Sequence, residues 1–162
     1  MVEESQEPAS TPTPVAADVL ASATDTEKKV PPKKEKPPAL EAKPFADFIN
    51  QDYLPTLQKS LIEKGIDDLS VSLEQAKIAV NGYETAPACS QVIGRWSGGK
   101  RQFNVYFFED NIQGQRAISI VDRATKSSSI EPFLIDERKI TLDLLVSSVV
   151  LRLNGQKWLT RN

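Results

Sequence analysis

The sequence predicts an α+β protein: a four-stranded antiparallel sheet flanked by an N-terminal and a C-terminal helix (α-β-β-β-β-α), behind a disordered N-terminal tail. Apolar residues recur every three to four positions in residues 45–61 and every second position in residues 68–74. This change of period indicates a helix followed by a strand. Short turns then separate three further apolar runs, and such turns join antiparallel neighbours. A proline-rich stretch predicts the tail.

Residues 1–43 form the predicted tail, and residues 44–162 form a single predicted domain. The tail holds seven of the eleven prolines of the chain and none of its aromatic residues. Such a composition buries too little apolar surface to offset the roughly 1–2 kcal/mol of backbone entropy that each ordered residue loses. We therefore expect the tail to be disordered, with residues 30–40 biased toward the polyproline II conformation.

The first helix is predicted over residues 45–61, and Pro55 lies inside its apolar pattern. Because proline lacks an N–H and its ring clashes with the preceding turn, we expect a kink or a restart near residues 52–54. Gly65 is expected to end the helix, since glycine readily adopts the left-handed conformation of the residue that follows a helix.

Four strands are predicted next, at residues 68–74, 90–96, 101–109 and 115–122. The turn Ser97–Lys100 contains two glycines and is expected to close a hairpin. In the third strand, aromatic side chains point to both faces, because Tyr106 and Phe108 alternate with Phe107. We therefore expect this strand either to be covered on both sides or to present one face to a partner.

The last element, residues 139–153, is rich in leucine and valine, and its β-branched residues leave strand and helix both open. Its length and the acidic pair Asp136 and Glu137 just upstream favour a helix, since these charges would meet the positive end of the helix dipole. Gly155 is expected to stop it. Apolar residues on nearly all sides predict a helix that is buried against the sheet.

Five segments resemble those of a known family: Gln91–Trp96 (QVIGRW), Arg101–Phe107 (RQFNVYF), Phe133–Arg138 (FLIDER), Leu142–Val146 (LDLLV) and Leu153–Trp158 (LNGQKW). From Lys43 onward the chain is similar to a small family of cyanobacterial and chloroplast proteins known only as a domain of unknown function. The resemblance implies a supporting role in the photosynthetic apparatus of a cyanobacterium. It transfers no functional residue.

The composition argues against an enzyme. The chain has no histidine, which excludes histidine-based acid–base catalysis, Ser–His–Asp and Cys–His pairs, and nearly every zinc arrangement. Neither a dinucleotide-binding motif nor a Walker motif occurs. A single cysteine, Cys89, forms neither an intrachain disulfide nor a multi-cysteine metal site. We expect no catalytic residue, no cofactor and no metal.

Charge and hydropathy predict a soluble, cytoplasmic protein. The N-terminus lacks the basic and apolar regions of a signal peptide. The longest apolar stretch, residues 140–153, is shorter than the ~20 residues that a transmembrane helix needs. The family resemblance adds the expectation of peripheral association with the thylakoid. Residues 90–128 carry six cations against three anions, a balance too weak to predict a nucleic-acid binder.

Two groups of residues are candidates for binding. Trp158, with Lys157 and Arg161, has the composition of an interface anchor, and the alternative is that Trp158 folds back to cap the core. The second group lies on the predicted sheet and consists of Tyr106, Phe108, Arg95, Lys100 and Arg101. We expect a non-catalytic binding or assembly factor with a protein partner. The alternatives are a carrier of a small apolar ligand and a weak binder of single-stranded nucleic acid.

Overall fold

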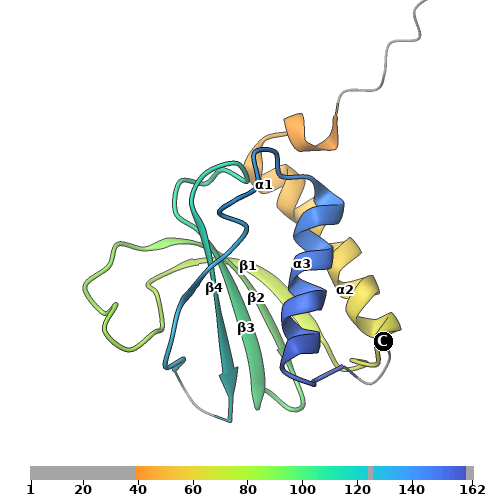
Figure 1. The fold of residues 1–162 in the computed structure, drawn as a ribbon, viewed down its shortest axis with the longest axis vertical. Coiled ribbons are helices and arrows are strands. Elements are labelled where there is room, and N and C mark those ends of the chain that lie inside the picture. The colour runs from red at the N-terminus through yellow and green to blue at the C-terminus, as the bar shows by residue number, and fades with distance from the viewer. Residues whose placement is uncertain (1–38, 124–125, 160–162) are drawn as a thin grey trace, which may run out of the picture. The chain divides into compact units, whose positions relative to one another are not determined.

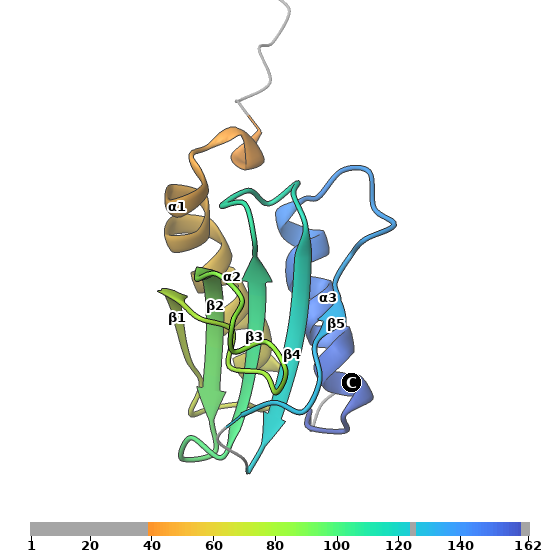
Figure 2. The same cartoon turned by 90° about the vertical axis from the view of Figure 1, so that its left-hand side faces the viewer.

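The computed structural model describes residues 39–123 and 126–159, which are drawn in colour in Figures 1 and 2. The elements are η1 (Leu40–Ala42), α1 (Phe45–Phe48), η2 (Ile49–Tyr53), α2 (Leu54–Glu63), β1 (Ser70–Ala76), β2 (Cys89–Trp96), β3 (Arg101–Phe107), β4 (Arg116–Asp122), β5 (Glu131–Pro132) and α3 (Leu142–Gly155). The predicted α+β class and the antiparallel sheet between two helical segments are confirmed. The predicted tail lies outside the described residues, except for its last five.

The sheet has five strands in the order β1-β2-β3-β4-β5, so each strand pairs with its neighbour in sequence. The predicted count of four was one strand too few. Glu131 pairs with Ile118, and Pro132 pairs with Ala117. A two-residue strand has no measurable period, and proline donates no backbone hydrogen bond to a ladder. The sequence pattern therefore contains no signal for β5.

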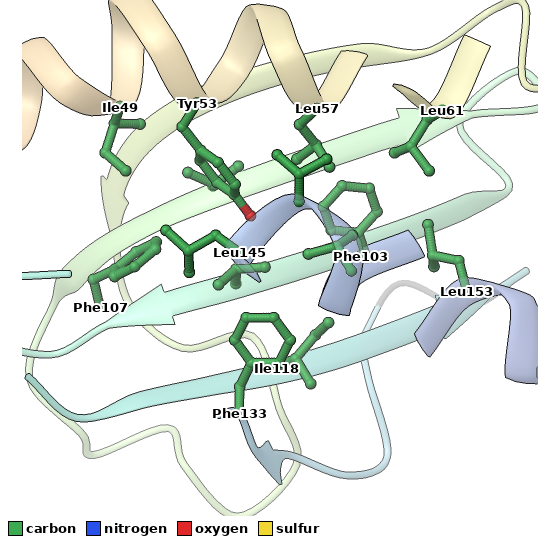
Figure 3. Close-up of a cluster of buried hydrophobic side chains, with 14 of the residues drawn as sticks. Ile49, Tyr53, Leu57, Leu61, Phe103, Phe107, Ile118, Phe133, Leu145 and Leu153 are labelled. Carbon is green, nitrogen blue, oxygen red and sulfur yellow. The ribbon is translucent and has the colours of Figure 1, made fainter. Parts of the chain in front are cut away.

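The main core lies between the sheet and the helices. Figure 1 shows α2 and α3 side by side on one face of the sheet. Figure 3 shows the side chains that fill the space between these helices and the sheet. The contributing side chains are fully or almost fully buried, and they include Tyr53, Leu57, Leu61, Phe103, Phe107, Ile118, Phe133, Leu145 and Leu153. Phe103 and Phe107 on β3 and Ile118 on β4 alternate with residues of the opposite face, which places these three on the helix-facing side of the sheet.

The first helical segment restarts where the sequence predicts. A π-helical turn, η2, ends at Tyr53, and α2 begins at Leu54 with Pro55 in its first turn. Proline is tolerated there because the first N–H groups of a helix have no intrahelical partner. Gly65 has a φ of +97°, and the N–H of Ile66 donates to the carbonyl of Leu61 at 3.1 Å. This is the left-handed helix end that was expected at Gly65.

Both ends of α3 differ from the expectation. The helix begins at Leu142, where the side chain of Thr141 accepts a hydrogen bond from the N–H of Leu144. The carboxylate that meets this end is Glu41, which accepts from the N–H of Leu142 at 3.1 Å. The helix begins three residues later than predicted, so Asp136 and Glu137 lie outside its first turn, where Asp143 is the acidic residue. Glu41 and Leu142 are 101 residues apart in sequence. The residues next to α3 therefore contain no signal for this contact.

The C-terminal end of α3 lies two residues beyond Leu153, the last residue of the predicted element. Gly155 is the last helical residue, and Lys157 takes the left-handed conformation with a φ of +56°. The N–H of Trp158 then donates to the carbonyl of Leu153 at 3.4 Å. This bond closes the helix end and directs Trp158 back toward the core. A lysine thus holds the position that usually favours glycine.

Replacing Lys157 by glycine is expected to stabilise the fold by about 0.5–1 kcal/mol. A left-handed backbone costs a residue with a Cβ about 1–2 kcal/mol, and glycine avoids this strain. Part of the gain is offset because glycine loses more backbone entropy on folding. Urea denaturation measures this change. Lys157→Ala is the matched control, since it removes the same side chain but keeps the strain. Equal stability of the two variants would contradict the left-handed assignment.

The hydroxyl of Tyr53 is buried in the core without a hydrogen-bond partner among the described residues. Its side chain is 0% exposed, and Figure 3 shows the oxygen pointing between the helices and the sheet. An unsatisfied buried hydroxyl costs free energy that a phenyl ring does not. Tyr53→Phe should therefore raise the free energy of unfolding by about 1 kcal/mol, measured as a higher urea midpoint at an unchanged slope.

The pH dependence gives an independent readout of the same residue. Burial raises the pKa of Tyr53 above its ordinary value of 10.0. The unfolded chain therefore loses this proton first, and stability that is present below pH 10 is lost as the pH rises. Tyr53→Phe should remove part of the alkaline loss. The pKa of buried Tyr106 is also raised, so a smaller loss should remain. An unchanged alkaline profile would contradict the burial of Tyr53.

The outer face of the sheet carries a second, smaller core. Figure 2 shows the loop of residues 77–88 crossing in front of the strands. It buries a cluster made of Ile78, Val80, Cys89, Tyr106 and Ala117. Polar side chains beneath it are paired: Asn104 donates to Gln91 at 3.2 Å, and the hydroxyls of Tyr106 and Ser119 lie 2.8 Å apart. At Tyr106, β3 is therefore covered on both faces.

Candidate functional site

A groove with a volume of about 650 Å³ lies beside the first half of β4. Four segments that are distant in sequence build it: the loop that contains Tyr83, the residues that follow β3, the start of β4, and residues 130–137 around β5. Figure 2 shows these segments around β4. The volume falls within the ~300–1,000 Å³ that is typical of binding pockets.

The groove gathers exposed hydrophobic side chains. Among the described residues six large hydrophobic side chains are exposed, and three of these line the groove: Tyr83 at 43%, Phe108 at 40% and Ile135 at 67%. Single exposed apolar side chains are common on protein surfaces, but a concave group of them marks an interaction site. Two of the three are aromatic, and aromatic residues are enriched in protein interfaces.

Arg116 fixes the groove from beneath. Its side chain is 6% exposed, and its guanidinium donates to the carbonyls of Ile112 at 2.7 Å, Gly114 at 2.5 Å and Leu134 at 2.6 Å. Burial lowers the pKa of this arginine. No carboxylate pairs with it in the described part of the chain, so its charge is stabilised by backbone dipoles. Arg116 thereby ties the loop after β3 to the segment after β5.

A second tie holds the far end of the same segment. The side chain of Gln113 donates to the carbonyl of Ile140 and accepts from its N–H, both at 2.8 Å. Leu134 has a left-handed φ of +54°, a conformation that leucine adopts only where its surroundings impose it. Ile135 and Glu137 lie between the ties at residues 134 and 140. The exposed position of Ile135 therefore belongs to a fixed loop.

The charged groups of the groove are mainly acidic. Glu109, Glu131 and Glu137 line it together with the single cation Arg116. Glu131 is engaged by Arg152, whose guanidinium donates to both of its carboxylate oxygens, at 2.5 and 2.7 Å. These hydrogen bonds lower the pKa of Glu131 and raise that of Arg152. Glu109 and Glu137 form no ion pair within the described residues, so their charges face solvent.

The residues that the sequence analysis proposed for binding lie in two separate places, one at each end of β3. Phe108 lines the groove that follows the strand. Lys100 and Arg101 lie at its start, where Arg101 pairs with Trp96 across the hairpin. Arg95 is on β2, half exposed, and is bonded to Gln102 at 2.9 Å and Glu74 at 3.4 Å. The basic candidates are therefore separated from Phe108 by the strand's length, ~3.3 Å for each of its residues.

Trp158 folds back onto the core at the basic end. Its ring meets that of Trp96 edge to face with centroids 5.3 Å apart, and the guanidinium carbon of Arg101 lies 5.1 Å from its centre. The side chain is partly buried against the main core. Lys157 is exposed beside it, and Arg161 lies outside the described residues. This geometry matches the alternative in which Trp158 caps the core.

Tyr106, one of the binding candidates, lies under the loop of residues 77–88 together with Cys89. Tyr106 is 0% exposed, so its ring offers no surface for stacking against a base or a partner. Cys89 is 5% exposed, and burial, together with the charge of Asp110, raises the pKa of its thiol. A thiol with a raised pKa forms little of the reactive thiolate. The structure gives Cys89 the role of a small core residue.

Sequence reasoning missed most of the groove. Tyr83, Ile135 and Glu137 are in loops, where no hydrophobic period shows which residues face each other. Arg116 did leave a signal, because it alternates with Ile118 and Ile120 and therefore occupies a helix-facing position of β4. A cation at such a position requires buried partners, which the carbonyls supply here.

Neither a metal centre nor a membrane-spanning helix occurs among the described residues. No group of three or more His, Cys, Asp or Glu side chains is placed to hold a metal ion in these residues. No helix of the described ranges is both long enough and apolar enough to cross a bilayer.

Comparisons with known proteins identify the family. No curated protein matches the chain. The model of a family described as a protein of unknown function, DUF2996, matches residues 39–160. The match begins with the first described residue and covers the helices, the whole sheet and all segments of the groove. The chain belongs to this family, the proteins of unknown function DUF2996.

Proposed function

We propose that this protein is a non-catalytic binding or assembly factor whose partner protein occupies the groove beside β4. The observation that carries the proposal is the exposure of Tyr83, Phe108 and Ile135 in one concave surface. Covering such side chains removes apolar area from water, which is the main favourable contribution to protein association. Exposed aromatic side chains that sit in a pocket are the usual centres of binding energy.

The fixed frame of the groove supports the same function. Arg116 and Gln113 hold the segment of residues 134–140 at both ends, so a partner meets a surface that is already formed. Preorganisation of this kind raises affinity, because less conformational entropy is lost on binding. The strain at Leu134 fits this role, since strained backbone concentrates at functional sites.

The cellular context of the proposal comes from the family resemblance. Within it, the partner is a component or an assembly intermediate of the photosynthetic apparatus of a cyanobacterium, and the protein acts in the cytoplasm or at the thylakoid surface. Co-purification from cells grown under several light regimes tests this context. Repeated recovery of partners that belong to no photosynthetic complex would contradict it.

Groove variants test the binding site. A tagged full-length chain is used to capture partners from cells that natively contain it. Phe108→Glu and Ile135→Glu should each lower partner recovery at least about tenfold, which corresponds to about 1.4 kcal/mol. The reason is that each places a charge where an apolar contact is expected.

Exposure-matched controls make this test specific. Ile62→Glu replaces a side chain that is 40% exposed, as Phe108 is, and Leu151→Glu replaces one that is 68% exposed, close to the 67% of Ile135. Both controls lie on the helices, and both should keep wild-type recovery. Recovery that survives in the groove variants and is lost in the controls would place the interface on the helices and overturn the proposal.

A second candidate, a carrier of a small apolar ligand, is favoured by the groove's volume and apolar lining. The space between the sheet and the helices is filled by side chains (Figure 3), so the ligand would have to bind in the groove. Native mass spectrometry of the protein from its own host distinguishes the two functions. A bound small molecule that is lost in Phe108→Glu would favour the carrier, and the mass of the bare polypeptide would count against it.

A further inference from the structure

The charge that a partner meets in the groove is negative. Three carboxylates against one guanidinium give a formal sum of −2 among the lining residues, and the pairing of Glu131 with Arg152 outside the groove reduces this to −1. The guanidinium is that of Arg116, which is buried and donates to three backbone carbonyls. Glu109 and Glu137 are exposed and form no ion pair within the described part of the chain. An anionic partner would be repelled, and a cationic one attracted.

The apolar lining and the carboxylates together suit one kind of side chain. Lysine and arginine bury an aliphatic stem along apolar surface while they keep the charged head group in water. The half-exposed rings of Tyr83 and Phe108 can contact such stems, and aromatic rings also attract cations over their faces. Glu109 and Glu137 then supply acceptors for the head groups.

We propose that the groove binds a cationic segment of a partner protein, in which lysine or arginine residues are interspersed with apolar ones. The proposal rests on the proposed function, because it names the chemistry of the partner at the same site. Charge complementarity selects a basic segment, and the exposed apolar lining requires apolar side chains within it. The groove's 650 Å³ accommodates several side chains of such a segment.

A second copy of this chain is the competing occupant. The opposite end of the sheet presents Lys100, Arg101 and Arg123 around one concave surface, and a head-to-tail contact would bring these cations to the groove of a neighbour. Such a contact repeats without closing unless the rotation forms a ring. Self-association of the full chain that is lost in Glu109→Gln/Glu137→Gln would assign the groove to a second copy and overturn the proposal.

A displayed library of random peptides, selected on the full-length chain, tests the partner's chemistry. Counter-selection on Phe108→Glu removes peptides that bind elsewhere. The retained peptides should carry an excess of lysine and arginine together with apolar residues. Their affinity should fall roughly three- to tenfold in Glu109→Gln/Glu137→Gln, since exposed charge pairs contribute modestly. It should also weaken as ionic strength rises from about 0.01 to about 0.15 M, which shortens the Debye length from about 30 to about 8 Å.

The control is Glu63→Gln/Glu74→Gln, which removes two exposed carboxylates on α2 and β1 and should leave peptide affinity unchanged. Peptides that depend on Phe108 but carry no excess positive charge would overturn this inference while the groove remains the binding site. Failure to retain any peptide would overturn it as well. Retention of partners from cells by the Phe108→Glu variant would instead overturn the proposed function itself.

Discussion

Replacing Gly94 by alanine is expected to destabilise the fold by about 3 kcal/mol, because the core has no room for one more carbon atom. A Cβ at this position would lie 2.2 and 2.4 Å from two ring carbons of Phe103. Phe103 is the cross-strand partner of Gly94 and is 0% exposed. Its ring also packs against Trp96, with the ring centroids 6.0 Å apart, so it cannot move aside without disturbing the core.

A double-mutant cycle separates this steric cause from a general loss of strand stability. Phe103→Leu alone should cost about 1–2 kcal/mol through the cavity that it leaves. In Gly94→Ala/Phe103→Leu the new methyl group enters that cavity, so the double variant should be more stable than the sum of the two losses predicts, by about 1 kcal/mol or more. Urea denaturation of the four proteins measures the coupling. Additive losses would contradict the close approach of Gly94 and Phe103.

Trp158→Ala is expected to destabilise the fold by about 2–4 kcal/mol, because the ring covers part of the main core. It contacts Trp96 edge to face and lies under the guanidinium of Arg101. Chemical denaturation decides between this role and that of an interface anchor. At temperatures where the variant remains folded, partner recovery should equal that of the wild type. Wild-type stability combined with lost recovery would make Trp158 an interface residue instead.

Trp158→Phe is the informative second variant. A phenyl ring retains the edge contact with Trp96 but covers less of the core. The loss of unfolding free energy in Trp158→Phe should therefore be smaller than in Trp158→Ala. Arg101→Met should cost less than about 1 kcal/mol, because the contact of its guanidinium with Trp158 is partly exposed. An Arg101 effect that is larger than the Trp158 effect would contradict the core-capping role.

Local pattern predicted the elements of this fold whose cause is local. The switch of apolar period, the restart at Leu54, the left-handed Gly65 and the hairpin at Ser97–Lys100 are all present. These features depend on residues that are close in sequence, such as Pro55 beside Leu54. The wrong expectations have distant causes. Glu41 caps α3 across 101 residues, and the left-handed residue after this helix is Lys157, whose neighbour Trp158 packs against the main core.

The groove was beyond sequence reasoning for the same reason. Of its exposed apolar residues, the sequence identified Phe108, because that residue continues the alternation of β3. Tyr83 and Ile135 reach the groove through loops whose course is set by tertiary hydrogen bonds, such as that from Arg116 to Leu134. No period or motif encodes such bonds. The basic candidates, in contrast, were identified by composition and lie at the other end of β3.

Backbone hydrogen exchange of the full-length chain, with and without a captured partner, tests the groove most directly. The two candidate surfaces lie at opposite ends of β3, so their exchange signals separate along the sequence. The account predicts slower exchange in the partner-bound state for residues 82–86, 108–117 and 130–137. Residues 97–101 and 152–158 should be unchanged. Slower exchange confined to residues 97–101 and 152–158 would place the partner on Trp158 and the basic turn, and would contradict the groove as the binding site.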